Sequence, residues 1–192
     1  MSRIDPDHLR SVLGARPPRR VPVVPPLREA AVALVLAPDG AGDLALLFIK
    51  RAEHPLDPWS GQIALPGGRR DPADPDLMGT AVRETAEETS VALAPGDLVG
   101  ELDDLSPVSP HLPPLVVRPF VFALPAVPAV RLSPEVAEYL WVSPRHLIDQ
   151  LREESVTVRD RTLLVRGYRA GPHFIWGMTE RIVTPFLQLV LQ

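Results

Sequence analysis

Three glutamates repeat at helical spacing within residues 83–88, which read Arg-Glu-Thr-Ala-Glu-Glu. Glu84, Glu87 and Glu88 stand at i, i+3 and i+4, so a helix would place their side chains on one face. Like charges at this spacing destabilise a helix by about 0.2–0.5 kcal/mol per close pair, and a bound cation would remove that repulsion. Oxygen ligands without Cys or His suit Mg²⁺ or Mn²⁺ better than zinc. The spacing therefore predicts a divalent-metal site, whose usual ligand is a phosphate; the alternative interpretation is a solvated helix face.

A glycine-bearing turn precedes this segment at a fixed distance. The run Leu65-Pro66-Gly67-Gly68 ends fifteen residues before Arg83, and apolar segments flank the turn and the glutamates. A tight turn followed by an acidic helix is a more specific pattern than a charge run by itself. The combination favours a functional site over a solvated face.

The composition is that of an ordinary globular chain. It has 192 residues, 45% hydrophobic and 23% charged residues, and a formal net charge of −4. These values predict one domain with its own core and give no electrostatic reason to expect a nucleic-acid partner. Cysteine is absent, which excludes disulfides, thiol catalysis and Cys-ligated zinc. We find neither an apolar span nor a signal core and expect a cytoplasmic protein without a membrane partner.

The elements that must position the glutamates follow from apolar patterning and from Pro and Gly punctuation. Strands are expected at 30–36, 44–50, 98–102, 116–124, 139–142, 162–166 and 174–176. Helices are expected at 5–14, 76–89, 144–154 and 178–191, the last interrupted by Pro185. Residues 53–76 are expected to form one long loop that contains the Pro-Gly-Gly turn. The pattern predicts a mixed α/β (α+β) fold with helices on both faces of a curved sheet. Residues 1–27 form an N-terminal helix and proline-rich arm, and residues 28–192 form a single domain.

The segment from the turn to the end of the acidic helix resembles the signature of the Nudix hydrolases. The matching residues are Gly68, Arg83, Glu84, Glu87, Glu88 and Val91. There are four departures: one extra residue precedes Arg83, Asp74 fills the acidic position of the loop, Thr85 replaces an aliphatic residue, and Ser90 replaces a glycine. The register from Arg83 to Val91 is intact, so the departures leave the glutamate cluster unchanged.

The flanking segments are similar to those of the coenzyme A pyrophosphatase subgroup of this family. The run 61–68 resembles its Gly-Gln-…-Phe-Pro-Gly-Gly element, with Leu65 in place of Phe. Residues 50–52 and 175–179 resemble two further segments of the subgroup. A second arginine expected between Ala52 and Gly61 is missing, and Leu56 stands roughly at its place.

The resemblance implies a Nudix-type α/β/α sandwich and a metal-dependent pyrophosphohydrolase. The substrate would be coenzyme A or acyl-coenzyme A, cleaved to 3′,5′-ADP and (acyl-)phosphopantetheine, with Mg²⁺ or Mn²⁺ as cofactor. The missing arginine favours an alternative, in which the substrate is another nucleoside diphosphate derivative or a nucleoside triphosphate. A non-catalytic nucleotide-binding module is a further alternative, which would ordinarily accompany loss of the glutamates. A homodimer is also expected from the family.

The resemblance also assigns roles to residues. The metal would be held by Glu84, Glu87, Glu88 and the backbone carbonyl of Gly68. The catalytic residues would be Glu87, Glu88, Arg83, Glu135 and Glu138, with Arg83 orienting a carboxylate and the last two as candidate general bases. Substrate contacts are expected from Arg51, Arg69, Gln62 and Trp59. Trp176 is a second tryptophan that could stack on adenine.

Overall fold

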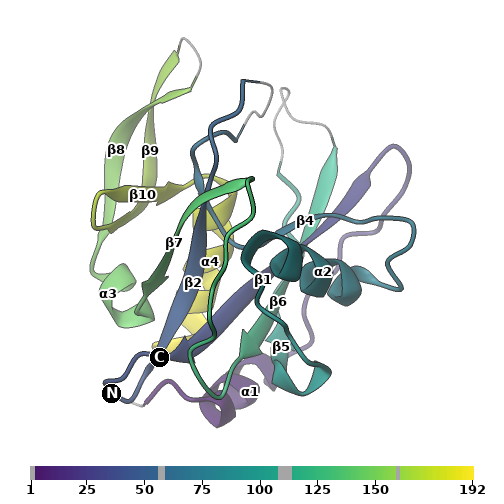
Figure 1. The fold of residues 1–192 in the computed structure, drawn as a ribbon, viewed down its shortest axis with the longest axis vertical. Coiled ribbons are helices and arrows are strands. Elements are labelled where there is room, and N and C mark those ends of the chain that lie inside the picture. Colours follow the sequence, from purple (N-terminus) through teal and green to yellow (C-terminus); the bar gives the residue numbers. More distant parts are fainter. Residues whose placement is uncertain (1–2, 56–58, 108–113, 159–160) are drawn as a thin grey trace.

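A seven-stranded mixed sheet forms the centre of the protein (Figure 1). The computed structural model describes residues 3–55, 59–107, 114–158 and 161–192. The strands of this sheet are β1 (Arg28–Pro38), β2 (Leu44–Arg51), β3 (Ile63–Ala64), β4 (Gly67–Arg69), β5 (Leu98–Glu101), β6 (Leu115–Ala123) and β7 (Val136–Val142). The long pairing of β1 with β6 is parallel and the other pairings are antiparallel. The predicted mixed sheet is confirmed.

A second, three-stranded sheet lies beside the first and is built from consecutive strands. These are β8 (Leu151–Val158), β9 (Arg161–Ala170) and β10 (His173–Trp176). The helices are α1 (Pro6–Gly14), α2 (Leu77–Thr89), α3 (Pro144–Ile148) and α4 (Met178–Val190), with a short 3₁₀ turn at Pro95–Asp97. Within the described residues, no helix has the length and apolar character needed to cross a lipid bilayer.

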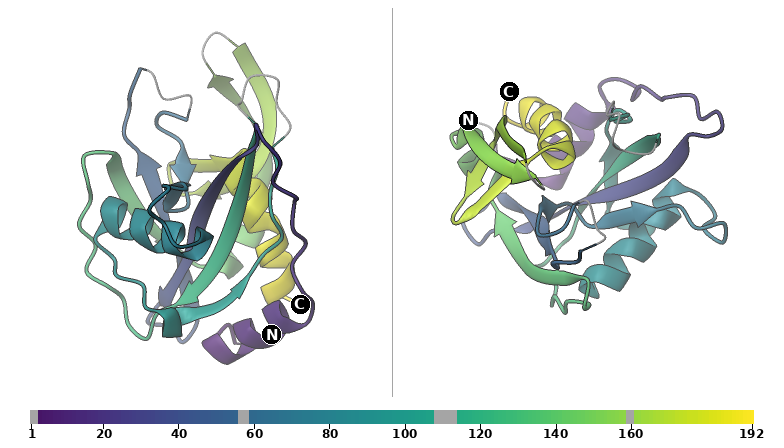
Figure 2. Two further views of the ribbon diagram at one scale, coloured as in Figure 1. Left: turned by 90° about the vertical axis from the view of Figure 1, so that its right-hand side faces the viewer. Right: turned by 90° about the horizontal axis from the view of Figure 1, so that it is seen from above.

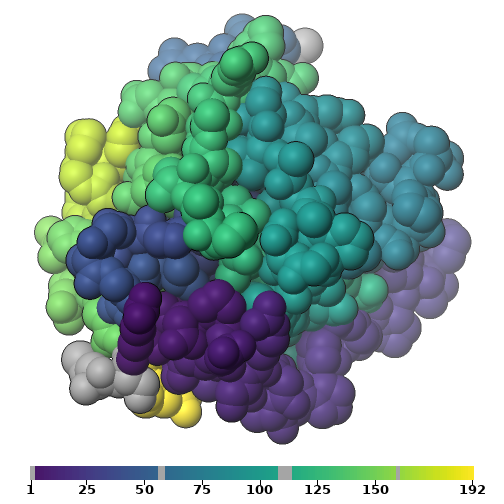
Figure 3. All heavy atoms as spheres, turned by 60° about the horizontal axis from the view of Figure 1, so that its bottom comes forward, coloured from purple at the N-terminus to yellow at the C-terminus, as the bar shows by residue number. Residues whose placement is uncertain are grey.

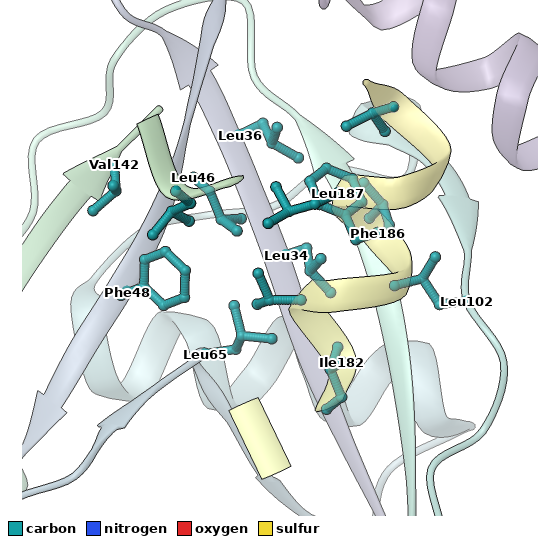
Figure 4. Close-up of a cluster of buried hydrophobic side chains, with 14 of the residues drawn as sticks. Leu34, Leu36, Leu46, Phe48, Leu65, Leu102, Val142, Ile182, Phe186 and Leu187 are labelled. Atoms are coloured by element: carbon teal, nitrogen blue, oxygen red, sulfur yellow. The ribbon is translucent and has the colours of Figure 1, made fainter. Parts of the chain in front are cut away.

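Helices cover both faces of the large sheet, as the left view of Figure 2 shows. Strand β1 alternates between the two faces because successive side chains of a strand point in opposite directions. Its small residues Ala31 and Ala33 belong to the apolar cluster beneath α2, so that helix can approach the sheet closely. Its leucines Leu34 and Leu36 belong to the cluster beneath α4 (Figure 4). The expected α/β/α arrangement is therefore confirmed.

Helix α4 is continuous through Pro185, which corrects the expected interruption. Proline removes one backbone hydrogen bond from the helix interior and strains the preceding turn. The neighbouring side chains Ile182, Phe186 and Leu187 are buried against the sheet, as Figure 4 shows. Burying side chains of this size contributes roughly 1.5–3 kcal/mol each, which offsets the local cost of the proline.

The segment expected as one long loop at 53–76 contains two short strands that bring the glycine turn into the sheet. Strand β1 pairs with β2 only at residues 36–38, and the two strands then diverge. Strand β3 continues the pairing of β2, and β4 continues that of β1. The Leu65–Gly68 turn therefore fills the opening between β1 and β2, and the amide of Ala33 donates to the Pro66 carbonyl at 2.8 Å.

The helix expected at 144–154 is wrong in its second half. Helix α3 ends at Ile148, and β8 begins at Leu151. Strand β8 pairs with β9 along its whole length, from Leu151 opposite Tyr168 to Val158 opposite Arg161. The charged run after Leu151 has no strong apolar alternation and therefore does not predict a strand, so the ladder with β9 decides its conformation.

The N-terminal segment packs against the large sheet. Ile4 and Leu9 are fully buried in the same apolar cluster as α4. Figure 3 shows the segment lying over this end of the molecule, where the Ile4 amide donates to the Asp43 carboxylate at 2.8 Å. The following arm is held by ion pairs from Arg16 and Arg19 to Asp103. The division at residue 27 stays a prediction.

Candidate active site

Helix α2 carries the three glutamates, and a capping interaction defines each of its ends. The Asp76 carboxylate accepts the Gly79 amide at 2.7 Å and caps the first turn. At the other end Ser90 takes the left-handed conformation, with φ of 58°, and its amide donates to the Ala86 carbonyl at 2.9 Å. Serine thus fills the position where the Nudix pattern has glycine, at a conformational cost of about 1 kcal/mol.

Asp74 in the loop before α2 fixes the side chain of Arg83. The guanidinium donates from Nε and Nη2 to the two Asp74 oxygens at 2.8 and 3.0 Å. Thr80 and the Asp71 amide also donate to this carboxylate. The hydrogen bonds from Arg83 are the main reason that the pKa of Asp74 lies far below its usual range, because they outweigh the effect of burial. The arginine is therefore locked onto the loop.

The locked Arg83 in turn orients two of the three glutamates. Its Nη1 lies 3.0 Å from Oε1 of Glu84 and 3.0 Å from Oε2 of Glu87. Its Nη2 also donates to the Arg69 carbonyl at 3.2 Å, which ties the helix to β4. The guanidinium thus places both carboxylates relative to the glycine turn, as expected of a residue that supports metal ligands.

The Glu84 carboxylate lies directly over Gly68. A methyl group on Gly68 would be 2.4 Å from the Glu84 carboxyl carbon, so a side chain there cannot coexist with this arrangement. Burial raises the pKa of Glu84, although Arg83 partly opposes the shift. The missing side chain of Gly68 is what brings the β4 backbone to the carboxylate cluster.

Glu88 is the most buried of the three glutamates, with 4% of its surface exposed. Its Oε2 accepts the Gly67 amide at 2.9 Å, and its Oε1 lies 4.0 Å from Nη1 of Arg51. Burial is the main reason that the pKa of Glu88 is raised to about 7; the Glu84 charge contributes to the rise, and the Gly67 hydrogen bond opposes it. The negative charge of this buried carboxylate is only partly balanced by its neighbours, so a bound cation would stabilise it.

A cavity of about 510 Å³ opens beside these residues and gathers most of the site that the sequence predicts. It is lined by Gly68, Glu84, Glu88 and Glu135, and by all four residues expected to contact substrate: Arg51, Trp59, Gln62 and Arg69. A smaller adjoining cavity of about 250 Å³ is lined by the three glutamates and Glu135. The Glu135 carbonyl accepts a hydrogen bond from the Ala52 amide at 2.8 Å, which holds Glu135 beside the end of β2 and this smaller cavity.

Glu138 is not brought to this cluster. Its two oxygens lie 3.3 Å from Nζ of Lys50 and 3.1 Å from Nε2 of His173, both of which line a different cavity. Of the two candidate bases from this region, Glu135 is therefore the one beside the glutamates.

The donor set fits a hard divalent cation. The acidic residues that line the two cavities offer carboxylate oxygens, three of them from consecutive turns of one helix, and Gly68 on the adjacent strand lines the same space. Within the described part of the chain, no three His, Asp or Glu side chains stand close enough to one point to hold an ion as they are. Glu84 and Glu87 both contact Arg83, so an ion held by all three glutamates would have to compete with the guanidinium for their oxygens.

One wall of the 510 Å³ cavity was missed by sequence reasoning. It is aliphatic and comes from three elements, β1, β6 and α4, through Ala30, Val32, Leu115, Val117, Met178 and Ile182. The sequence placed all of them except Leu115 in strands or a helix, but apolar periodicity is the same for a core face and a cavity wall. Asp74 was noted as the acidic loop position, and its bidentate hold on Arg83 could not be foreseen from spacing.

Comparison with known proteins agrees with this geometry. The NUDIX domain family matches residues 26–165. A relative from Yersinia pestis (strain Pestoides F), named "Uncharacterized Nudix hydrolase NudL", is 32% identical over 148 residues, which cover 76% of this chain and 72% of the relative. Nudix hydrolases generally use divalent metal ions, in keeping with the donor set described above.

Two solved structures share the fold. A MutT/nudix family protein from Enterococcus faecalis has a TM-score of 0.58 and 18% identity, covering 90% of this chain and 65% of the other. An Ap4A hydrolase from C. elegans has a TM-score of 0.50 and 22% identity, covering 62% of this chain and 82% of the other. The glutamate cluster, the glycine turn and these matches lead to one conclusion: the chain belongs to the Nudix hydrolase family and is a pyrophosphohydrolase.

Proposed function

We propose that this enzyme hydrolyses the pyrophosphate linkage of coenzyme A or acyl-coenzyme A to 3′,5′-ADP and (acyl-)phosphopantetheine. The observation that carries the proposal is the aliphatic wall, defined as Ala30, Val32, Leu115, Val117, Met178 and Ile182. It lies in the same cavity as Gly68, Glu84 and Glu88, so the group next to the reacting pyrophosphate meets this wall.

The aliphatic wall distinguishes between the two ends of such a substrate. A nucleobase here would bury ring nitrogens beside side chains that cannot hydrogen-bond, at about 1–3 kcal/mol for each unsatisfied group. The dimethyl group, methylenes and acyl chain of acyl-phosphopantetheine would instead gain roughly 0.8 kcal/mol per buried methylene. The wall therefore supports a substrate with an aliphatic arm on one side of the pyrophosphate.

The hydrolytic residues follow from the same arrangement. Glu84, Glu87, Glu88 and the Gly68 carbonyl would hold Mg²⁺ or Mn²⁺, which supplies polarisation of the phosphate oxygens when bound. Arg83 would keep the carboxylates in position. An attacking water can lose its proton to Glu88 or to Glu135, because both line the cavity where the pyrophosphate would lie.

The remaining polar lining suits the phosphates. Arg51 and Arg69 bring positive charge to the cavity, and Gln62 and Trp59 complete its polar side. A guanidinium matches a phosphate through paired N–H groups, which makes both arginines suitable for the pyrophosphate oxygens.

A second candidate is hydrolysis of another nucleoside diphosphate derivative or of a nucleoside triphosphate. The absence of the second arginine of the coenzyme A subgroup favours it, but Leu56 at that place lies outside the described residues. The C. elegans structure of similar fold is an Ap4A hydrolase, whose name adds dinucleoside polyphosphates to this list. A cytoplasmic location and a homodimer stay predictions.

The proposal is tested by comparing kcat/KM for acetyl-coenzyme A, ADP-ribose, Ap4A and ATP in Mg²⁺. The comparison is made for wild type and for a variant with a polar side chain in the aliphatic wall. Val117→Thr places a hydroxyl in the aliphatic wall, and Val121→Thr makes the same change on the same strand, buried in the core outside the cavity. We expect acetyl-coenzyme A to be preferred, and Val117→Thr to lower its kcat/KM roughly tenfold while the control changes little. Preference for ATP or ADP-ribose, or equal effects of the two variants, would overturn it.

A further inference from the structure

A second cavity of about 850 Å³ lies next to the catalytic one. It is formed where the β8–β9 hairpin and the segment after β2 rise on the same side of the molecule (Figure 1). Residues of β8 and β10 line it, so the small sheet supplies much of its wall. The reaction described above uses none of the residues that the small sheet contributes.

The two cavities adjoin at shared lining residues. Gln62 and Ile63 line both of them, and Arg51, which lines the catalytic cavity, directly follows Lys50, which lines the second. A molecule whose pyrophosphate lies at the glutamates can therefore extend in two directions. One direction leads along the aliphatic wall, and the other passes Gln62 toward the small sheet.

The lining of the second cavity has the opposite chemistry to the aliphatic wall. Two aromatic rings, Phe174 and Trp176, come from β10, and the guanidinium of Arg169 lies 5.5 Å from the Phe174 ring centre. Polar side chains surround these rings: His54, Ser60, Gln62, Thr157 and His173. Flat aromatic surfaces with hydrogen-bonding groups around them match a purine, which has two π faces and a polar edge.

We infer that the second cavity binds the purine nucleoside end of the substrate, while the aliphatic wall receives the other end. The inference rests on the proposed function in one respect, because it requires a substrate with a nucleoside on one side of the pyrophosphate. It makes the small sheet β8–β10 a recognition element, separate from the helix that carries the metal-binding residues.

The first test is isothermal titration calorimetry of metal-free protein with AMP, which needs no turnover. Trp176→Leu removes one aromatic wall of the cavity, and Tyr139→Leu removes an exposed aromatic ring from β7, outside the cavity lining. Loss of base stacking should weaken AMP binding roughly 5- to 150-fold in Trp176→Leu and leave the control near wild type. Equal affinities in the two variants, or no measurable binding of millimolar AMP to wild type, would overturn the inference.

A surface variant covers the case in which Trp176→Leu does not fold. Thr157 is exposed on the hairpin and lines the cavity, and Ser155 is exposed on the same strand outside the lining. Thr157→Glu should weaken AMP binding because the longer charged side chain would occupy the space for the base, and Ser155→Glu, outside the lining, should weaken it less. A Thr157→Glu variant that binds AMP as tightly as Ser155→Glu contradicts the inference.

Steady-state kinetics separate this inference from the proposed function. If both hold, Trp176→Leu raises KM for coenzyme A and largely keeps kcat. If AMP binding depends on Trp176 but coenzyme A is not cleaved, the purine cavity stands and the substrate assignment falls. If coenzyme A is cleaved but neither Trp176→Leu nor Thr157→Glu changes AMP affinity, the inference about the purine cavity is wrong and the substrate assignment stands.

Discussion

Replacing Glu88 by Gln should stabilise the metal-free protein and abolish its activity. Glu88 is 4% exposed, and its carboxylate accepts a hydrogen bond from the Gly67 amide. Burial is the main reason that its pKa rises from 4.5 to about 7, and the charge of Glu84 adds to the rise. A residue selected for stability alone would not keep an ionisable group in such a place, whereas a metal ligand must.

The magnitude follows from the difference between the two pKa values. At roughly 1.4 kcal/mol per pH unit, ionising Glu88 in the folded protein costs about 3 kcal/mol more than in the unfolded chain. Because the folded pKa is the higher one, this penalty is absent below about pH 4.5, grows as the pH rises toward 7 and is complete above it. Glutamine has no charge to desolvate, so it removes the penalty.

The assay is thermal unfolding in chelator at pH 5 and pH 8.5. At the higher pH, Glu88→Gln should unfold roughly 6–12 °C above wild type, and at the lower pH the gap should narrow. Glu87→Gln is the matched stability control, because the Glu87 side chain is 59% exposed and pays little for its charge. Mg²⁺ should raise the melting temperature of wild type more than that of Glu88→Gln.

Turnover of the same proteins completes the test. We expect Glu88→Gln to lower kcat by about 10³-fold or more, since the substitution removes both a ligand charge and a candidate base. The reasoning is refuted if the variant is folded and active at the wild-type level. It is also refuted if wild type and Glu88→Gln melt at the same temperature at pH 8.5.

Three further predictions concern two positions around the cluster and one that anchors the arm. Gly68→Ala should lower kcat by about 10²-fold through displacement of the neighbouring carboxylate, with a small change in melting temperature; unchanged kinetics would contradict the close approach. Asp74→Asn should weaken Mg²⁺ activation about 10- to 100-fold, because Arg83 loses its charged anchor, and a Mg²⁺ titration identical to wild type would contradict that role. Asp104 has a fully buried side chain, and burial alone would raise its pKa. Hydrogen bonds from Arg118 and the Val21 amide, with the charges of Arg118 and Arg20, together lower that pKa. The ionised Asp104 should therefore stabilise the fold above about pH 4, and this stabilisation should be lost below it. Asp104→Asn should make the melting temperature fall less steeply at acid pH than it does in wild type. Parallel curves of melting temperature against pH for the two proteins would contradict this prediction.

The parts of the site that the sequence predicts are those set by local spacing. The helical positions of Glu84, Glu87 and Glu88 depend on one element, and any helix through them gives one face. The Leu65–Gly68 turn needs small residues next to the helix, and the pattern shows them directly. These features required no knowledge of distant contacts.

The parts that could not be predicted depend on tertiary pairing. Strand β8 exists because β9 supplies its ladder, and the charged run after Leu151 carries no trace of that partner. The continuity of α4 through Pro185 depends on what its apolar face buries. The aliphatic wall and the second cavity are formed by strands and helices far apart in the sequence, whose convergence only the fold defines.

Mass spectrometry of the reaction products tests the central claim most directly. Wild type and Glu88→Gln would be mixed with coenzyme A, acetyl-coenzyme A, ADP-ribose, Ap4A and ATP, in Mg²⁺ or Mn²⁺ and in chelator. The account predicts metal-dependent appearance of 3′,5′-ADP together with phosphopantetheine from wild type, and its loss in chelator and in Glu88→Gln. Cleavage of another member of the mixture without these two products, or their formation in chelator, would contradict it.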